Sequence, residues 1–208
     1  MPLQSRVSPF GDLFADRSRG LLYGNRGGRF HRDDKTLSAR RWASHAWICC
    51  LLSFKGRHRP VWGRGFTGLF FLDEVTAFAA GHRPCFECRR KDAEAFARLW
   101  PGRRKRDDRA YVAEMDVILQ AERLDGREKM THRLAVDELP DGATIVMPGD
   151  EGQAAMLRGG QLLRWSSTGY VSAGSRPRRI KVDVLTPPSI LAVLKAGYKP
   201  LWHPSANS

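Results

Sequence analysis

Two cysteines in the middle of the chain have the spacing of a metal-binding or redox motif. Cys85 and Cys88 form the C-x-x-C of the segment R-P-C-F-E-C-R, at the start of a predicted helix. In such a turn two sulfur atoms can lie within about 4 Å of one point, while backbone amides and the helix dipole lower the thiol pKa. The motif predicts metal binding, because no βαβ pattern surrounds it to indicate a thioredoxin-like redox role.

A tetrahedral zinc site needs two further ligands, and the chain offers few. The only other cysteines, Cys49 and Cys50, lie in the apolar run W-I-C-C-L-L-S-F at 47–54, which predicts a buried strand. Because side chains alternate along a strand, these cysteines face opposite sides of it. Only one of them can therefore reach the C-x-x-C turn at Cys85 to Cys88, termed the knuckle. We predict the metal ligands Cys85, Cys88, Cys50 and His82. The alternatives are Cys49 in place of Cys50, His45 or His58 in place of His82, and a metal-free scaffold whose thiols serve as packing.

Regular elements on both sides must position the knuckle. An apolar strand is predicted at 69–72, followed by a short helix with Asp73 as its N-cap and Gly81 as its left-handed C-cap residue. After the knuckle, an apolar stripe at helical spacing predicts a second helix. The residues of this stripe are Ala93, Phe96, Ala97 and Trp100.

The run F-F-L-D-E-V-T-A-F-A-A-G-H-R-P-C-F-E-C-R resembles the second half of the zinc-binding domain of Ada-type DNA methylphosphotriester repair proteins. In that family a phenylalanine-containing strand, an "EA-x-x-AG" helix and a "[FY]RPCxxC" knuckle follow in this order. The resemblance covers about Leu69 to Arg90 and implies a zinc-stabilised DNA-repair module. The family completes a four-thiolate site with an upstream C-x-x-x-C, one cysteine of which accepts a methyl group from DNA phosphate. Here Cys49 and Cys50 stand in its place, so we expect a related scaffold without methyl transfer.

The positive charge is confined to one half of the chain. Residues 1–106 contain 22 Lys and Arg against 9 Asp and Glu, whereas residues 107–208 contain 13 of each, so the whole excess of +13 lies in the first half. Such segregation is typical of a surface that binds a polyanion, because phosphate neutralisation releases counterions. We predict contact with nucleic acid, DNA in the first place, and no contact with a membrane. The predicted contact residues are Arg26, Arg29, Lys55, Arg57, Arg59, Arg64, Arg89 and Arg90.

The pattern predicts an α+β fold in three parts. Residues 1–41 are expected to form a mobile, basic Arg/Gly-rich arm. Residues 42–106 form the basic Ada-like C-x-x-C module, and residues 107–208 form a neutral module. The last part begins with a helix that ends near Arg123 and closes with a helix after T-P-P-S. Between them, five short apolar runs predict a small curled sheet or barrel, with R-G-G-Q as a tight hairpin. These runs are 144–147, 154–157, 162–165, 170–172 and 180–185.

The sequence favours a nucleic-acid-binding protein, zinc-stabilised and linked to DNA repair or modification. Two alternatives stay open: an enzyme that acts on DNA or RNA through Cys or His near the knuckle, and a basic interaction module for an acidic protein. His132 and His203 are expected to be ordinary surface histidines. No paired carboxylates, nucleophile elbow or phosphate-binding loop is present. Without a signal-peptide pattern or a long apolar run, we expect a cytoplasmic protein.

Overall fold

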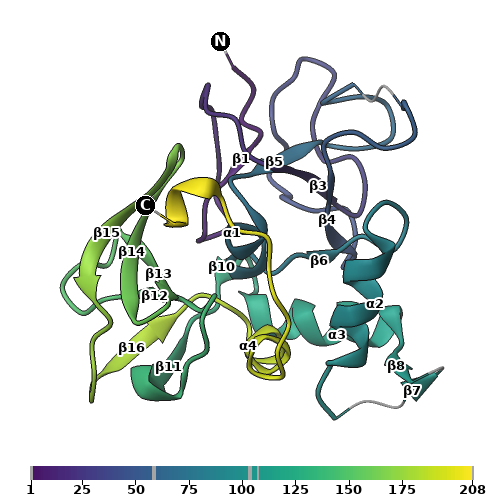
Figure 1. The fold of residues 1–208 in the computed structure, drawn as a ribbon. Coiled ribbons are helices and arrows are strands. Elements are labelled where there is room, and N and C mark those ends of the chain that lie inside the picture. The colour runs from purple at the N-terminus through teal and green to yellow at the C-terminus, as the bar shows by residue number, and fades with distance from the viewer. Residues whose placement is uncertain (1, 58–59, 103–104, 107, 208) are drawn as a thin grey trace.

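The computed structural model describes residues 2–57, 60–102, 105–106 and 108–207. This part of the chain contains two six-stranded sheets and four α-helices, so the predicted α+β class is confirmed. The helices are α1 (Glu74–Ala79), α2 (Arg90–Arg98), α3 (Val112–Arg123) and α4 (Pro188–Lys195). Figure 1 shows the second sheet in green on one side, the first in purple and blue on the other, and α1 between them. His58 and Arg59, both named as candidate site residues, lie outside the described residues.

The first sheet carries the strands that position the cysteines, in the order β2-β1-β5-β3-β4-β6. β3 lies at its centre and pairs antiparallel with β5 and β4, and β6 pairs parallel with β4 at one edge. The strands predicted at 47–54 and 69–72 are confirmed over 47–51 and 69–71, as β4 and β5. The first strand is shorter than predicted, and Leu51 and Leu52 at its end are exposed. The strands are β1 (Arg6–Val7), β2 (Leu13–Phe14), β3 (Leu22–Arg26), β4 (Trp47–Leu51), β5 (Leu69–Phe71) and β6 (Arg83–Pro84).

Residues 1–41 differ from the expected mobile arm. β1, β2 and β3 belong to the first sheet, and all five residues of β3 are buried. The glycines that indicated mobility are positions of close packing. A Cβ at Gly20 would lie 1.8 Å from the carbonyl oxygen of Phe71, and one at Gly24 would lie 2.2 Å from that of Ile48. Only glycine lets the backbone approach its neighbours this closely, which is why a glycine-rich segment occupies the middle of the sheet.

Helix α1 is buried along its whole length and links the two halves. As predicted, Asp73 caps it by accepting a hydrogen bond from the Thr76 amide at 2.9 Å, and Gly81 follows its end with φ +81°. The Asp73 carboxylate also accepts hydrogen bonds from the Tyr170 hydroxyl at 2.7 Å and the His203 amide at 3.0 Å. One capping residue therefore joins the first half of the chain to the second.

The second sheet is antiparallel, with the order β11-β16-β12-β13-β14-β15. Its last five strands coincide with the five predicted runs, and α4 confirms the predicted terminal helix. The tight hairpin is also confirmed, because Gly159 and Gly160, both with positive φ, connect β13 to β14. The strands are β11 (His132–Ala135), β12 (Thr144–Val146), β13 (Ala154–Arg158), β14 (Gln161–Ser166), β15 (Gly169–Ser175) and β16 (Lys181–Val184).

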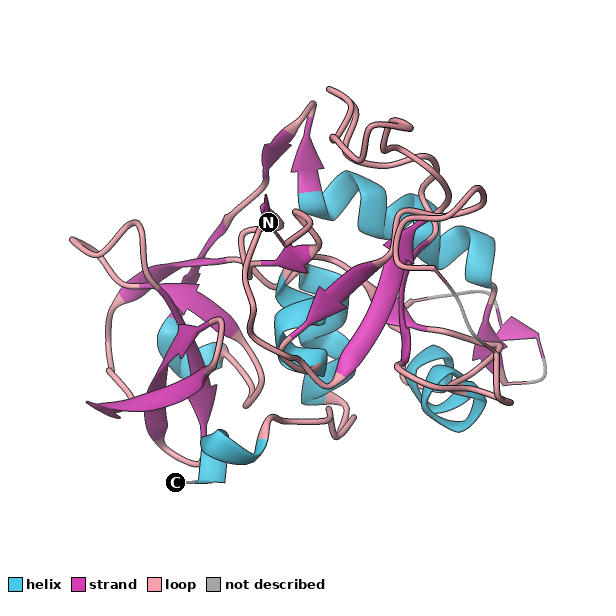
Figure 2. Ribbon diagram, turned by 90° about the horizontal axis from the view of Figure 1, so that it is seen from above, coloured by secondary structure: helices cyan, strands magenta, loops and turns pink. Residues whose placement is uncertain are grey.

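The two halves share hydrophobic cores. Phe78 of α1, Phe96 of α2, Met115 of α3 and Ile190 of α4 belong to one cluster, so residues on both sides of position 107 pack together. Figure 2, viewed from above, shows helical segments between the strands of the two sheets. The remaining short elements are β7 (Lys105–Arg106), β8 (Arg109–Ala110), β9 (Leu124–Asp125), β10 (Glu128–Lys129) and two single-turn helices at 136–138 and 204–207. Within the described ranges, no helix has the length and apolar character needed to cross a membrane.

Candidate metal centre

The C-x-x-C knuckle meets Cys50 because β4 and β6 are neighbouring parallel strands. Pro84 lies opposite Cys49, and the Cys85 amide donates a hydrogen bond to the Cys49 carbonyl oxygen at 3.0 Å. The chain then turns before α2 and brings Cys88 back towards the same strand. As a result the sulfur atoms of Cys50, Cys85 and Cys88 all lie within 4.8 Å of one another. Two elements far apart in sequence thus build a three-thiol group.

This geometry fits a thiolate-bound metal ion. Tetrahedral zinc with Zn–S bonds of about 2.3 Å places its sulfur ligands about 3.8 Å apart, so the observed separations need to shrink by at most about 1 Å. Cys50 and Cys85 are buried, and Cys88 is half-buried. In the described part of the chain, no fourth His, Cys, Asp or Glu joins this group. The residues therefore supply three sulfur ligands and leave one coordination position open.

Hydrogen bonds favour the thiolate form of Cys85. Donation from the thiols of Cys50 and Cys88, and then from the backbone amides of Cys88 and Glu87, lowers the pKa of the Cys85 thiol far below its ordinary value. The same bond to Cys85, together with burial, raises the pKa of the Cys50 thiol. The Leu51 amide points at the Cys88 sulfur at 3.4 Å. A divalent cation that binds here would displace the remaining thiol protons.

Cys49, the neighbour of Cys50, lies on the other face of β4 and has a different environment. It is 0% exposed, burial raises its pKa, and Arg89 donates a hydrogen bond to its sulfur at 3.2 Å. Arg89 also forms an ion pair of 2.8 Å with the buried Glu74. Glu74 in turn accepts hydrogen bonds from the Tyr198 hydroxyl and the Leu201 amide. This network fixes the start of α2, and with it the knuckle, against α1 and the C-terminal segment.

A cavity of about 320 Å³ opens beside the three-thiol group. Cys50 and Cys88 form part of its wall, and Arg57 lies in the same wall with its guanidinium 5.7 Å from the ring centroid of Phe54. Arg57 is exposed and also pairs with Glu87, the residue before Cys88. The other lining residues are Tyr23, Leu51, Leu52, Ser53, Val61 and Phe70. The sequence pattern did not identify this cavity, because its aromatic rings come from three separate segments.

His82, the predicted fourth ligand, is placed elsewhere. It is 0% exposed, with its ring centroid 4.6 Å from that of Phe71 and 5.1 Å from that of Trp47. Its Nε2 accepts a long hydrogen bond of 3.5 Å from Arg26. Burial, followed by the charges of nearby Arg26 and Arg123, lowers its pKa well below the ordinary value. His82 is a neutral core histidine, because the short connection between α1 and β6 places its side chain in the aromatic core.

The other histidines that the structure describes stay outside the three-thiol group. His45 is exposed, and its carbonyl oxygen accepts a hydrogen bond from Arg123. His132 and His203 contact the Glu122 carbonyl and the Ser205 hydroxyl at 2.9 and 2.8 Å, which are ordinary local contacts.

Two of the cations predicted to contact nucleic acid are buried, and the structure corrects that prediction. Arg26 is 2% exposed, lies over Trp47 and donates to the Gly11 carbonyl at 2.7 Å. Arg89 is bound to Glu74, as described above. Internal acceptors from remote parts of the chain hold both guanidinium groups, so neither is available to phosphate. The exposed candidates are Arg29, Lys55, Arg57, Arg64 and Arg90.

Comparisons with known proteins give no relative. The chain matches no protein-family model, no curated protein and no solved structure. The three-thiol group, its cavity and the exposed cations beside it are therefore the observations from which a function is proposed.

Proposed function

We propose that this protein binds one zinc ion through Cys50, Cys85 and Cys88. The observation that carries the proposal is the convergence of three sulfur atoms within 4.8 Å from two separate segments. Amide-to-sulfur hydrogen bonds and burial further support a site that holds thiolates. Zinc suits this donor set, because thiolates bind it strongly and three sulfur ligands are common in its sites.

We further propose that the protein binds nucleic acid, DNA in the first place, through exposed cations of the segments 52–57 and 60–66, both of which contribute to the cavity beside the metal centre. These cations are Lys55, Arg57 and Arg64. The positive excess of the chain lies in the same half, which supports binding driven by counterion release. An acidic protein is the rival partner, and the salt dependence of DNA binding separates the two.

The relation to Ada-type repair proteins remains part of this proposal. The order strand β5, helix α1, knuckle and helix α2 in the structure supports it. The absence of an upstream C-x-x-x-C leads us to expect no methyl transfer.

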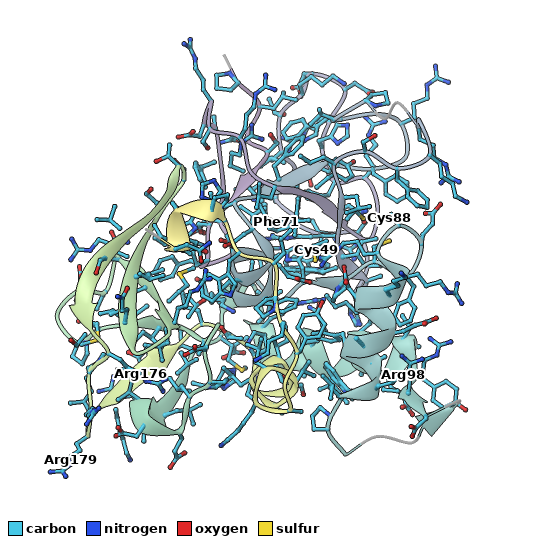
Figure 3. All side chains as sticks on the ribbon, viewed as in Figure 1. Cys49, Phe71, Cys88, Arg98, Arg176 and Arg179 are labelled. Atoms are coloured by element: carbon cyan, nitrogen blue, oxygen red, sulfur yellow. The ribbon has the colours of Figure 1, made fainter. Side chains whose placement is uncertain are left out.

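The test of nucleic-acid binding compares two double variants that remove the same charge. Arg57→Ala/Arg64→Ala should reduce the slope of log K against log salt by about 2, because each lost phosphate contact removes about one unit. Arg178→Ala/Arg179→Ala is the control, since both arginines are exposed and lie in the half without charge excess. Figure 3 shows Arg179 at the opposite end of the molecule from Cys88. Equal losses for the two variants, or no binding at low salt, would contradict the proposal.

A second candidate function is an enzyme that acts on nucleic acid at the metal. It is favoured by the open coordination position and by the adjoining cavity, since catalytic zinc sites commonly combine three protein ligands with one exchangeable position. Incubation with methylphosphotriester DNA, followed by mass spectrometry, tests its alkyl-transfer form. We expect no added methyl group; a stoichiometric methyl on Cys50 would instead establish the enzyme.

A further inference from the structure

A second group of charged residues, separate from the three thiols, is buried between the first sheet and the β9–β10 hairpin. Arg26 and Arg123 are 2% and 0% exposed, and their guanidinium carbons lie 4.0 and 3.9 Å from the ring centroid of Trp47. The half-buried Lys129 donates to the carbonyl oxygens of Ala79 at 2.9 Å and Leu185 at 2.6 Å. Two guanidinium groups thus lie over one indole ring, and a third cation lines the same cavity as they do.

These cations have hydrogen-bond acceptors and no ion-pair partner. Arg26 donates to the Gly11 carbonyl at 2.7 Å, and Arg123 donates to the Gly81 carbonyl at 2.9 Å. Carbonyl oxygens satisfy N–H groups without neutralising the charge. Among the described residues no carboxylate forms an ion pair with Arg26, Arg123 or Lys129, and the buried Nε of Arg123 has no hydrogen-bond partner. Asp12 and Asp116 offset part of the charge of Arg26 and Arg123 without forming an ion pair with them. Because burial of the remaining positive charge is costly, the arrangement indicates a site for an anion.

The cations line a cavity of about 300 Å³. Five basic residues and only two acidic residues, Asp12 and Glu128, contribute to its wall. The basic ones are Arg26, Arg41, Arg123, Arg127 and Lys129. Trp42 is also in the wall, half-buried, with its ring centroid 6.1 Å from that of Trp47. The lining combines excess positive charge with an aromatic surface. Such a wall complements a ligand that has both an anionic group and an aromatic ring.

The electrostatics of the three inner cations agree with this geometry. Burial, and then the charges of Arg123 and Arg26, lower the pKa of Lys129 to about 7. Burial likewise lowers the pKa of Arg26 to about 9 and that of Arg123 to about 8. The cations repel one another in a poorly solvated space, and a bound anion would remove this repulsion.

We propose that this cavity binds the phosphate of a small phosphorylated molecule, of the nucleoside monophosphate class. Lys129 and the exposed Arg41 and Arg127 would contact the phosphate, and the buried Arg26 and Arg123 add positive potential behind them. The ring of Trp42 offers a stacking surface for the base. A volume near the lower limit of ligand cavities suits a mononucleotide rather than a duplex. The site shares no residue with the metal centre, so it adds a second binding function to the one proposed above.

Isothermal titration calorimetry tests the proposal with adenosine 5′-monophosphate, adenosine and inorganic phosphate as probes. The monophosphate should bind, adenosine should not, and inorganic phosphate should compete with the monophosphate. Arg41→Ala/Arg127→Ala should weaken binding about a hundredfold, since each lost charge-assisted hydrogen bond is worth about tenfold or more. Both side chains are exposed, so this variant should fold. The matched control is Arg178→Ala/Arg179→Ala, which should bind as the wild type does.

Three outcomes would overturn the proposal. They are failure of both the monophosphate and inorganic phosphate to bind, equal weakening in the two double variants, and binding of a 5′-phosphorylated oligonucleotide but not of the monophosphate. Zinc content, measured on the same samples, should be unchanged in both variants, which keeps this test independent of the metal proposal. Lys129→Met, checked for folding by circular dichroism, should abolish the competition of inorganic phosphate with the monophosphate.

Discussion

Replacement of Arg89 by methionine is the sharpest test of how the knuckle is held in place. The Arg89 guanidinium contacts three groups: the Glu74 carboxylate at 2.8 Å, the Asp92 carboxylate at 2.8 Å and the Cys49 sulfur at 3.2 Å. The side chains of Arg89 and Glu74 are only 4% and 1% exposed. The variant keeps most of the apolar stem and leaves the Glu74 carboxylate buried without a counter-charge.

The size of the effect follows from this burial. Removal of one partner of a buried ion pair costs about 3 to 5 kcal/mol of unfolding free energy. For a chain of this length, that loss lowers the melting temperature by about 6 to 20 °C. Arg133→Met is the matched control, because Arg133 forms a 3.2 Å ion pair with Asp183 in which the side chains are 52% and 41% exposed. That exposed pair should contribute no more than about 1 kcal/mol.

The dependence on pH distinguishes loss of the ion pair from loss of packing. Burial raises the pKa of Glu74, and Arg89 opposes that rise, so the variant should raise the pKa further. A carboxyl whose folded pKa lies above its unfolded value favours folding below the unfolded value of about 4.3, and this contribution is lost as pH rises through the folded pKa. The loss of unfolding free energy caused by Arg89→Met should therefore be smaller at pH 5 than at pH 8.

Chemical unfolding followed by circular dichroism, at both pH values and for both variants, measures these differences. Two results would refute the role assigned to the buried ion pair. One is that Arg89→Met loses no more unfolding free energy than Arg133→Met, and the other is that its loss is the same at pH 5 and pH 8.

Two further predictions concern the elements around the site. Gly24→Ala should unfold or strongly destabilise the first sheet, because its Cβ would lie 2.2 Å from a backbone oxygen, whereas Gly65→Ala, with open space around it, should melt like the wild type. His82→Gln should remove part of the acid sensitivity of folding: the depressed pKa of His82 contributes stability above the unfolded value of about 6.5, and this stability is lost as pH falls through the folded pKa. Unfolding free energies at pH 7.5 and pH 5.5 test this, and parallel curves for variant and wild type would contradict it.

The local features of the fold could be predicted from the sequence. The N-cap at Asp73, the Gly159-Gly160 hairpin and the terminal helix each depend on a few adjacent residues, so short-range rules suffice. The alternation of side chains along β4 also separates Cys49 from Cys50, and only Cys50 joins the knuckle. These inferences depend only on the local geometry of a strand, a turn or a helix end, and they require no knowledge of the tertiary structure.

The remaining features depend on contacts between remote segments. Gly20 and Gly24 have the composition of a mobile arm, and only the neighbouring strands show that close packing requires them. Arg26 and Arg89 resemble surface cations in sequence, but Trp47 and Glu74 surround them from other elements. No spacing rule relates Cys50 to Cys85, because β5 and α1 lie between β4 and β6 along the chain. The sequence could therefore limit the third ligand to Cys49 or Cys50, but the motif alone could not choose between them.

The most direct test of the central claim is the zinc content of the purified protein, measured by inductively coupled plasma mass spectrometry. The wild type should carry one zinc ion per chain, and Cys49→Ser should keep it, because that sulfur lies outside the three-thiol group. Cys50→Ser, one residue further along the same strand, should lose zinc and melt at a lower temperature, since thiolate ligation contributes to folding. A wild type that takes up no zinc under reducing conditions, or equal zinc in the two serine variants, would contradict the assignment of Cys50, Cys85 and Cys88 as a metal centre.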